Sequence, residues 1–144
     1  MEDGKKGGLT AEEGAKIIAM MEDMGLDAVE ISGGVGANSA RKGIKSAARE
    51  AYFRPLIQLA RSKTGLPLII VGGMRSKAVM EEVLFSGDAD FIAMSRPLIN
   101  DPNFPNLMKS GEQERSACIS ASNCWAENIG EGIACKCENS YQRI

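Results

Sequence analysis

Two short apolar runs constrain the fold of this chain most. Residues 66–71 read Leu-Pro-Leu-Ile-Ile-Val, and residues 89–94 read Ala-Asp-Phe-Ile-Ala-Met. Apolar runs of this length are typical of strands buried on both faces, as in a parallel sheet. The first run is followed by Gly72-Gly73 and the second by Ser95-Arg96. We therefore expect two neighbouring strands whose carboxyl ends carry these residues.

The residues after the two runs suit an anion. Gly72 and Gly73 allow the backbone to come close to a ligand because no Cβ stands in the way. The guanidinium of Arg96 binds phosphate oxygens two at a time. Glycine pairs are also ordinary turn residues, so the interpretation depends on Arg96. We expect Arg75, beyond the glycine turn, to face solvent, and Ser76 to cap the following helix.

The rest of the chain up to residue 110 alternates helices with strands, which predicts an α/β fold with a parallel sheet. Thr10 and Glu13 form a capping box that predicts a helix to about Met24, ended by Gly25. The other expected elements are a strand at 26–31, helices at 50–63 and 77–85, and a short helix from Pro102 to Lys109 that is capped by Asp101 and ended by Gly111.

Residues 33–48 have no clear periodicity, which is typical of a functional lid or of a disordered loop. The basic residues of this stretch either contact an anionic cofactor or form a solvated surface. These residues are Arg41, Lys42 and Lys45.

The composition excludes several function classes. The net charge is −2 and the basic residues are spread along the chain, which argues against nucleic acid and anionic membranes as partners. No apolar run approaches the ~20 residues of a membrane span, and the first residues lack the apolar core of a signal peptide, so we expect a cytoplasmic protein. The chain has no histidine, so its chemistry proceeds without imidazole.

Four motifs together carry a resemblance to a known family. They are Gly7-Gly8-Leu9-Thr10, Ile31-Ser32-Gly33-Gly34, residues 71–75 and residues 95–102. In this order and spacing they resemble the C-terminal part of the old yellow enzyme family, whose members are FMN-dependent NAD(P)H:flavin oxidoreductases and ene-reductases built on a TIM barrel. A complete barrel needs about 250 residues, and this chain has 144. The resemblance therefore implies about three βα units in residues 1–110, matching strands six to eight, and an irregular tail in residues 111–144.

The resemblance also implies a cofactor site. The FMN phosphate would be held after the last two strands, where TIM barrels commonly bind phosphate, with NADH or NADPH as the reductant. The implied cofactor-binding residues are Gly72, Gly73, Ser95, Arg96, Ser32, Gly33 and Gly34. Ser95 stands where the family usually has glycine. The first five strands, which carry the flavin-ring and substrate contacts, are absent by family order, so no catalytic residue is assigned and we do not expect turnover by this chain alone.

All four cysteines lie in the tail, at positions 118, 124, 135 and 137. The iron-sulfur branch of the family, which resembles 2,4-dienoyl-CoA reductase, carries closely spaced cysteines here, but Ala121 stands where the middle ligand is expected. A four-thiolate cluster needs four converging ligands, and the Cys-x-x-Cys pairs of zinc sites are absent. The sequence disfavours an iron-sulfur cluster and favours reduced thiols over a zinc site or a disulfide.

Two functions are compatible with these patterns. The first is the C-terminal fragment of an FMN-dependent oxidoreductase, in which hydride is transferred from flavin N5 to an acceptor. The alternative is a non-catalytic phosphate-binding or scaffold fragment that needs a partner chain. In either case a three-stranded parallel sheet leaves an edge unpaired, so we expect a homo-oligomer or association with an N-terminal half-barrel.

Overall fold

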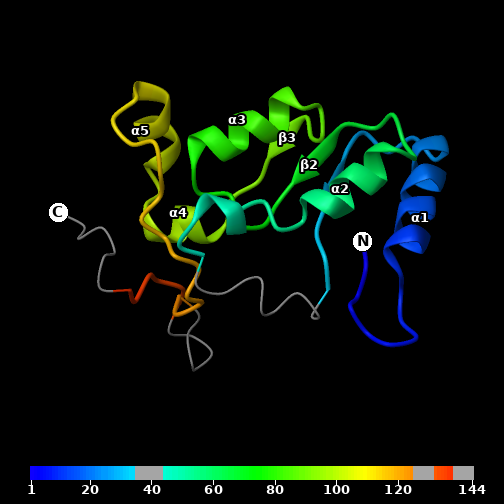
Figure 1. The fold of residues 1–144 in the computed structure, drawn as a ribbon, viewed down its shortest axis with the longest axis horizontal. Helices are drawn as coiled ribbons and strands as arrows, with labels where there is room; N and C mark the ends of the chain where they lie inside the picture. The colour runs from blue at the N-terminus through cyan, green and yellow to red at the C-terminus, as the bar shows by residue number, and fades with distance from the viewer. Residues whose placement is uncertain (35–43, 125–131, 138–144) are drawn as a thin grey trace.

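A three-stranded parallel sheet forms the centre of the molecule. The computed structural model describes residues 1–34, 44–124 and 132–137. Its strands are β1 (Val29–Ile31), β2 (Leu68–Ile70) and β3 (Phe91–Ile92), paired in the order β1-β2-β3. All three predicted strands are present, each shorter than the apolar run that predicted it. In Figure 1 the sheet lies between α1 at one end of the molecule and α5 at the other.

Helices connect and flank the strands. Those in the described part of the chain are α1 (Ala11–Asp23), α2 (Arg54–Arg61), α3 (Lys77–Phe85), α4 (Arg96–Asn100) and α5 (Phe104–Ser110), with a 3-10 turn η2 (Ala47–Arg49). The predicted capping box is present, because the Glu13 N–H donates to Thr10 Oγ1 at 3.2 Å and the Thr10 N–H donates to Glu13 Oε2 at 2.9 Å. None of the helices in the described residues is long and apolar enough to cross a membrane.

Two predicted helix starts were wrong, the first being that of the helix expected over 50–63, which begins at Arg54 as α2. The helix expected from Pro102 begins at Phe104, because the Asp101 carboxylate accepts the Asn103 N–H at 2.9 Å and holds residues 101–103 in a turn. The short helix α4, which precedes this turn, was not predicted. Ser76 does occupy the N-cap position of α3 but makes no side-chain cap. Its hydroxyl donates instead to the buried carboxylate of Glu50 at 2.8 Å.

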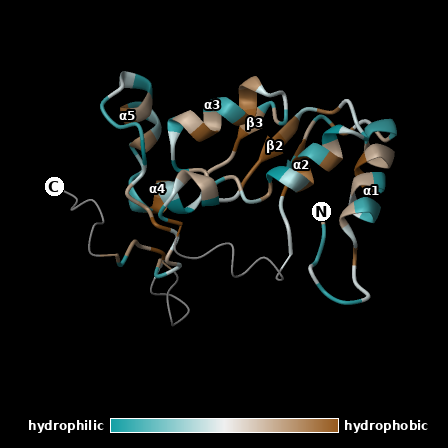
Figure 2. Ribbon diagram, in the orientation of Figure 1, coloured by the Kyte–Doolittle hydropathy of each residue, from teal (hydrophilic) through white to brown (hydrophobic). Residues whose placement is uncertain are grey.

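The core lies on one face of the sheet. Ile31, Leu68 and Ile70 are almost completely buried, and they pack with side chains of the helices, including Ile57, Ala60, Met80, Val83 and Phe104. Figure 2 shows the apolar colour concentrated on β2 and β3. The register places Glu30, Ile69 and Phe91 in a row on the opposite face. Phe91 is 57% exposed, so this face is poorly covered.

The beginning of the tail packs at the carboxyl ends of the strands. Residues 111–124 contain no helix or strand. They are held by backbone hydrogen bonds, since the Ser116 N–H donates to the Arg75 carbonyl at 2.9 Å and the Ile44 N–H donates to the Ile119 carbonyl at 2.8 Å. The tail therefore forms one wall of the site described next.

Candidate anion-binding site

A small pocket opens where β2 and β3 end. It is lined by residues 71–75, residues 93–97, Tyr52 and Ser120. The sequence-predicted residues Gly72, Gly73, Ser95 and Arg96 all lie in this lining. The cavity volume is about 60 Å³. Because pockets that enclose drug-sized ligands measure roughly 300–1,000 Å³, this one has room for an anion the size of phosphate and not for a whole flavin.

Both glycines have a backbone conformation that other residues rarely adopt. The φ angle is 103° at Gly72 and 75° at Gly73. Their missing side chains make room for aromatic rings as well. A Cβ on Gly72 would lie 2.7 Å from ring atoms of both Tyr52 and Phe53, and a Cβ on Gly73 would lie 2.9 Å from Tyr52. The sequence analysis explained these glycines by the close approach of a ligand. The structure adds a second reason, because the rings of Tyr52 and Phe53 occupy the space that a Cβ would need.

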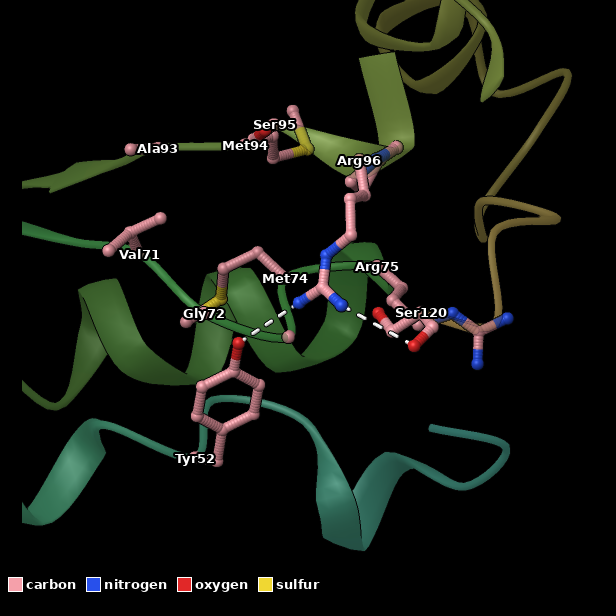
Figure 3. A pocket seen from close by; sticks show the side chains of 12 residues that line it. Tyr52, Val71, Gly72, Met74, Arg75, Ala93, Met94, Ser95, Arg96 and Ser120 are labelled. Atoms are coloured by element: carbon pink, nitrogen blue, oxygen red, sulfur yellow. Dashed lines mark hydrogen bonds between the residues drawn. The ribbon is translucent and has the colours of Figure 1, made fainter. Parts of the chain in front are cut away.

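The Arg96 side chain lies across the pocket. Its Nη2 donates to the Tyr52 hydroxyl at 3.1 Å, and its Nη1 lies 3.4 Å from both the Ser120 carbonyl and the Ser122 hydroxyl. Figure 3 shows Arg96 entering from the start of α4 and Tyr52 entering from the opposite side, so that their ends meet beside Gly72. The pocket thus holds a fixed cation, hydroxyl groups and a glycine turn, and these features fit a phosphate group.

Arg75 does not face solvent, so that expectation was wrong. The residue is 5% exposed. Its guanidinium donates to the Ile44 carbonyl at 2.5 Å and to the Ser116 carbonyl at 2.9 Å. Burial, and then the nearby charge of Arg115, lowers the pKa of Arg75 from its ordinary value. Although Arg75 touches the pocket, its donors hold the tail and residue 44 in place, a role that sequence spacing does not reveal.

A buried carboxylate supports the turn after Gly73. The Glu50 side chain is fully buried, and it accepts the Ser76 N–H at 2.9 Å and an Arg115 Nη2 proton at 3.1 Å. These bonds connect the segment before Tyr52 to the start of α3 and to the tail. The three chain segments around the pocket are therefore fixed to one another.

The other predicted site residues lie outside this pocket. Ser32, Gly33 and Gly34 follow β1 at the same end of the sheet. Gly33 pairs with Glu2 in a parallel bridge, and the Ser32 carbonyl accepts a hydrogen bond from the Met1 amino group at 2.7 Å. Lys45 is exposed, while Arg41 and Lys42 lie outside the described residues.

The four thiols lie in one region of the tail. Cys118 and Cys124 are buried, and all four cysteines are free thiols. Burial opposes ionisation of Cys135, but hydrogen bonds from Asn100, at 3.4 Å, and from Cys137 lower the pKa of Cys135. Burial, then the charge of Cys135, raises the pKa of Cys137, and Cys118 and Cys124 act in the same direction. Within the described ranges, no group of three or more His, Cys, Asp or Glu side chains is arranged to hold a metal ion.

Comparison with known proteins agrees with the motifs. Residues 1–115 match the model of the NADH:flavin oxidoreductase / NADH oxidase family. An NADH oxidase of Thermoanaerobacter brockii is 30% identical over 134 residues, which are 92% of this chain and 21% of that protein. The NADH-dependent flavin oxidoreductase iccE of Talaromyces variabilis is 34% identical over 95 residues, which are 60% of this chain and 23% of that protein.

A third relative is an NADPH dehydrogenase of Geobacillus thermodenitrificans. It is 31% identical over 98 residues, which are 68% of this chain and 27% of that protein. The chain therefore spans between 21% and 27% of the length of these three relatives.

Proposed function

This chain belongs to the NADH:flavin oxidoreductase / NADH oxidase family, as its motifs predicted, and we propose that it holds the phosphate of FMN in the pocket between Gly72, Gly73 and Arg96. FMN, when bound, supplies hydride transfer between NADH or NADPH and an acceptor. The residues of this chain contribute charge and orientation, since they anchor the cofactor at its phosphate end. The observation that carries the proposal is the position of Arg96, whose guanidinium lies beside the glycine turn.

We further propose that the chain acts as the C-terminal fragment of a cytoplasmic TIM-barrel oxidoreductase. Residues 1–110 would supply the last three βα units and residues 111–144 a separate tail. The small share of each relative that the chain spans and the open sheet face support this interpretation. Ser32, Gly33 and Gly34 would then meet the cofactor farther from its phosphate. Cell fractionation tests the location, and turnover with NADH or NADPH tests the activity.

The alternative proposal is a phosphate-binding or scaffold fragment without activity of its own. The pocket volume of about 60 Å³ favours it, because the flavin ring needs contacts beyond this cavity. Visible absorbance separates the two functions. A purified protein with flavin absorbance that oxidises NADH supports the oxidoreductase, whereas a colourless, inactive protein supports the scaffold.

Titration with FMN tests the pocket itself. Replacing Arg96→Ala removes a charge-assisted phosphate contact, so the FMN dissociation constant should rise roughly 10- to 100-fold. Arg61→Ala is the matched control, because Arg61 pairs with Asp90 just before β3, at the end of the strand away from the pocket. Equal binding by the wild type and Arg96→Ala would mean that the phosphate is held elsewhere.

We propose that no iron-sulfur cluster is bound, because Ala121 replaces the expected middle ligand. Iron in anaerobically purified protein should stay far below the roughly four atoms per chain that a four-iron cluster requires. A stoichiometric iron content would contradict this and would require Cys135 and Cys137 to complete the site.

A further inference from the structure

Tyr52 lies at the pocket although no sequence motif pointed to it. It precedes α2, 44 residues before Arg96, and its hydroxyl accepts a hydrogen bond from Arg96 Nη2 at 3.1 Å. The ring lines the pocket together with Gly72 and Gly73. A side chain from a distant part of the chain therefore reaches both the cation and the glycine turn of the proposed phosphate site.

The position of the Tyr52 ring is fixed from several sides. The ring packs edge-to-face on Phe53, with centroids 4.6 Å apart, and fills the space that side chains at Gly72 and Gly73 would occupy. Ala51, just before it, has a φ of 48°, which alanine rarely adopts. Ala51 is also buried, with 6% of its surface exposed, so neighbouring residues hold it in this conformation. Strained backbone of this kind persists where the surrounding structure determines it.

A second pair of unusual residues faces the same guanidinium. Ser120 and Ser122 have φ angles of 56° and 65°. The Ser120 carbonyl and the Ser122 hydroxyl both accept from Arg96 Nη1. Arg96 is thus oriented by Tyr52 on one side and by the tail on the other, as Figure 3 shows for Tyr52 and Ser120.

The hydrogen-bonding capacity of the tyrosine points to a second role. A phenol oxygen accepts through its lone pairs and donates its single proton. The bond from Arg96 uses a lone pair of Tyr52 and leaves the O–H proton to donate. No acceptor for this proton is found among the described residues. A phosphate oxygen bound beside Arg96 is a suitable acceptor.

We propose that Tyr52 is a further phosphate-binding residue, which orients the Arg96 guanidinium and donates its own hydroxyl proton to the anion. The inference rests on the proposed FMN site and adds a neutral donor to it. An uncharged hydroxyl donor strengthens anion binding without adding charge. The ring of Tyr52 also closes the side of the pocket at Gly72 and Gly73.

Tyr52→Phe is the sharpest test, because it keeps the ring against Gly72 and Gly73 and removes only the hydroxyl. FMN should bind Tyr52→Phe roughly tenfold more weakly than the wild type. Riboflavin, which lacks the phosphate, should bind both proteins equally. Ser62→Ala, which removes a hydroxyl bonded to the Leu59 carbonyl in α2, is the control and should bind FMN like the wild type.

The outcomes separate this inference from the proposed function. If Arg96→Ala loses FMN while Tyr52→Phe keeps it, the pocket stands and the role of Tyr52 is overturned. The same holds if Tyr52→Phe weakens FMN and riboflavin alike.

If the wild type binds no FMN, the proposed function fails, and inorganic phosphate becomes the probe. The side-chain NMR signals of ¹⁵N-arginine-labelled protein, assigned with Arg96→Lys, then decide. Phosphate-induced shifts of the Arg96 signals that weaken in Tyr52→Phe support the inference. Equal shifts in both proteins, or none in either, overturn it.

Discussion

Gly72 is constrained by its backbone and by its neighbours at once. Its φ of 103° excludes most residues, and the rings of Tyr52 and Phe53 occupy the place of a Cβ. Gly87 offers a comparison, since its φ is 76° but a Cβ at this position would meet no other atom within 4 Å. The two positions therefore separate backbone strain from steric conflict.

We predict that Gly72→Ala destabilises the protein more than Gly87→Ala. Gly87→Ala should lose about 1–2 kcal/mol, the cost of a left-handed conformation. Gly72→Ala should lose about 1–3 kcal/mol more, because the aromatic pair must move. Urea denaturation monitored by circular dichroism measures both. Equal losses would show that the rings of Tyr52 and Phe53 move aside for a Cβ at position 72 without a cost in stability.

At the scale of elements, α2, α3 and β3 are joined by ion pairs at the amino end of β3. Arg54 donates from Nε to Asp88 at 2.6 Å and from Nη1 to Glu82 at 2.5 Å. Asp90, paired with Arg61, accepts the Leu68 N–H at 2.8 Å. The amino ends of barrel strands typically carry stability, and these contacts agree with that role.

The pH dependence of this network has a definite sign. Burial raises the pKa of Asp88, but hydrogen bonds from Arg54, Ser86 and Gln58 outweigh burial and bring the pKa below its ordinary value. A lowered carboxyl pKa contributes stability that is present above the unfolded value and lost as the pH falls through the folded value.

We predict that Asp88→Asn loses roughly 1–2 kcal/mol of stability at pH 7. The difference from the wild type should begin to shrink as the pH falls below about 4, where the Asp88 carboxyl of the unfolded chain takes up a proton, and it should disappear only below the lowered pKa of the folded protein. Thermal melts from neutral to strongly acidic pH give the comparison, with Glu81→Gln on the exposed side of α3 as the control. A stability difference between the wild type and Asp88→Asn that stays constant over this pH range would show that Asp88 acts through packing and not through its charge.

Short-range sequence patterns predicted the helices and strands, whereas the candidate site also depends on contacts between residues that are far apart in the chain. The capping box at Thr10 and the bounds of α3 depend on neighbours within a few residues, so the sequence was sufficient to predict them. Gly72, Gly73, Ser95 and Arg96 also follow predicted strands directly. Tyr52 meets Arg96 across 44 residues, and Arg75 meets Ser116 across 41. Such contacts depend on the arrangement of the strands and loops in space, and the hydrophobic periodicity of the sequence does not specify this arrangement.

At the scale of the whole molecule, the sheet has one covered face and one open face. The open face carries Ile69 and the largely exposed Phe91. Near β1 a second apolar surface is formed by Leu9, Ile17, Met21 and their neighbours. Among the described residues, β1 and β3 are the two edge strands of the sheet, and the chain near β1 adds only an isolated bridge between Glu2 and Gly33, just after the strand. Open faces and edges of this kind promote association between chains.

We predict that the chain associates with a second copy or with an N-terminal half-barrel, burying more than ~1,000 Å² of largely apolar surface. Light scattering during size-exclusion chromatography at micromolar concentration should give a mass well above 15.4 kDa. Phe91→Glu places a charge on the open face, while the buried face with Leu68 and Ile70 is unchanged, so it should shift the protein toward monomer without unfolding it. If the wild type instead melts cooperatively as a monomer near 15.4 kDa, association is not required for the sheet to be stable, and the prediction is wrong.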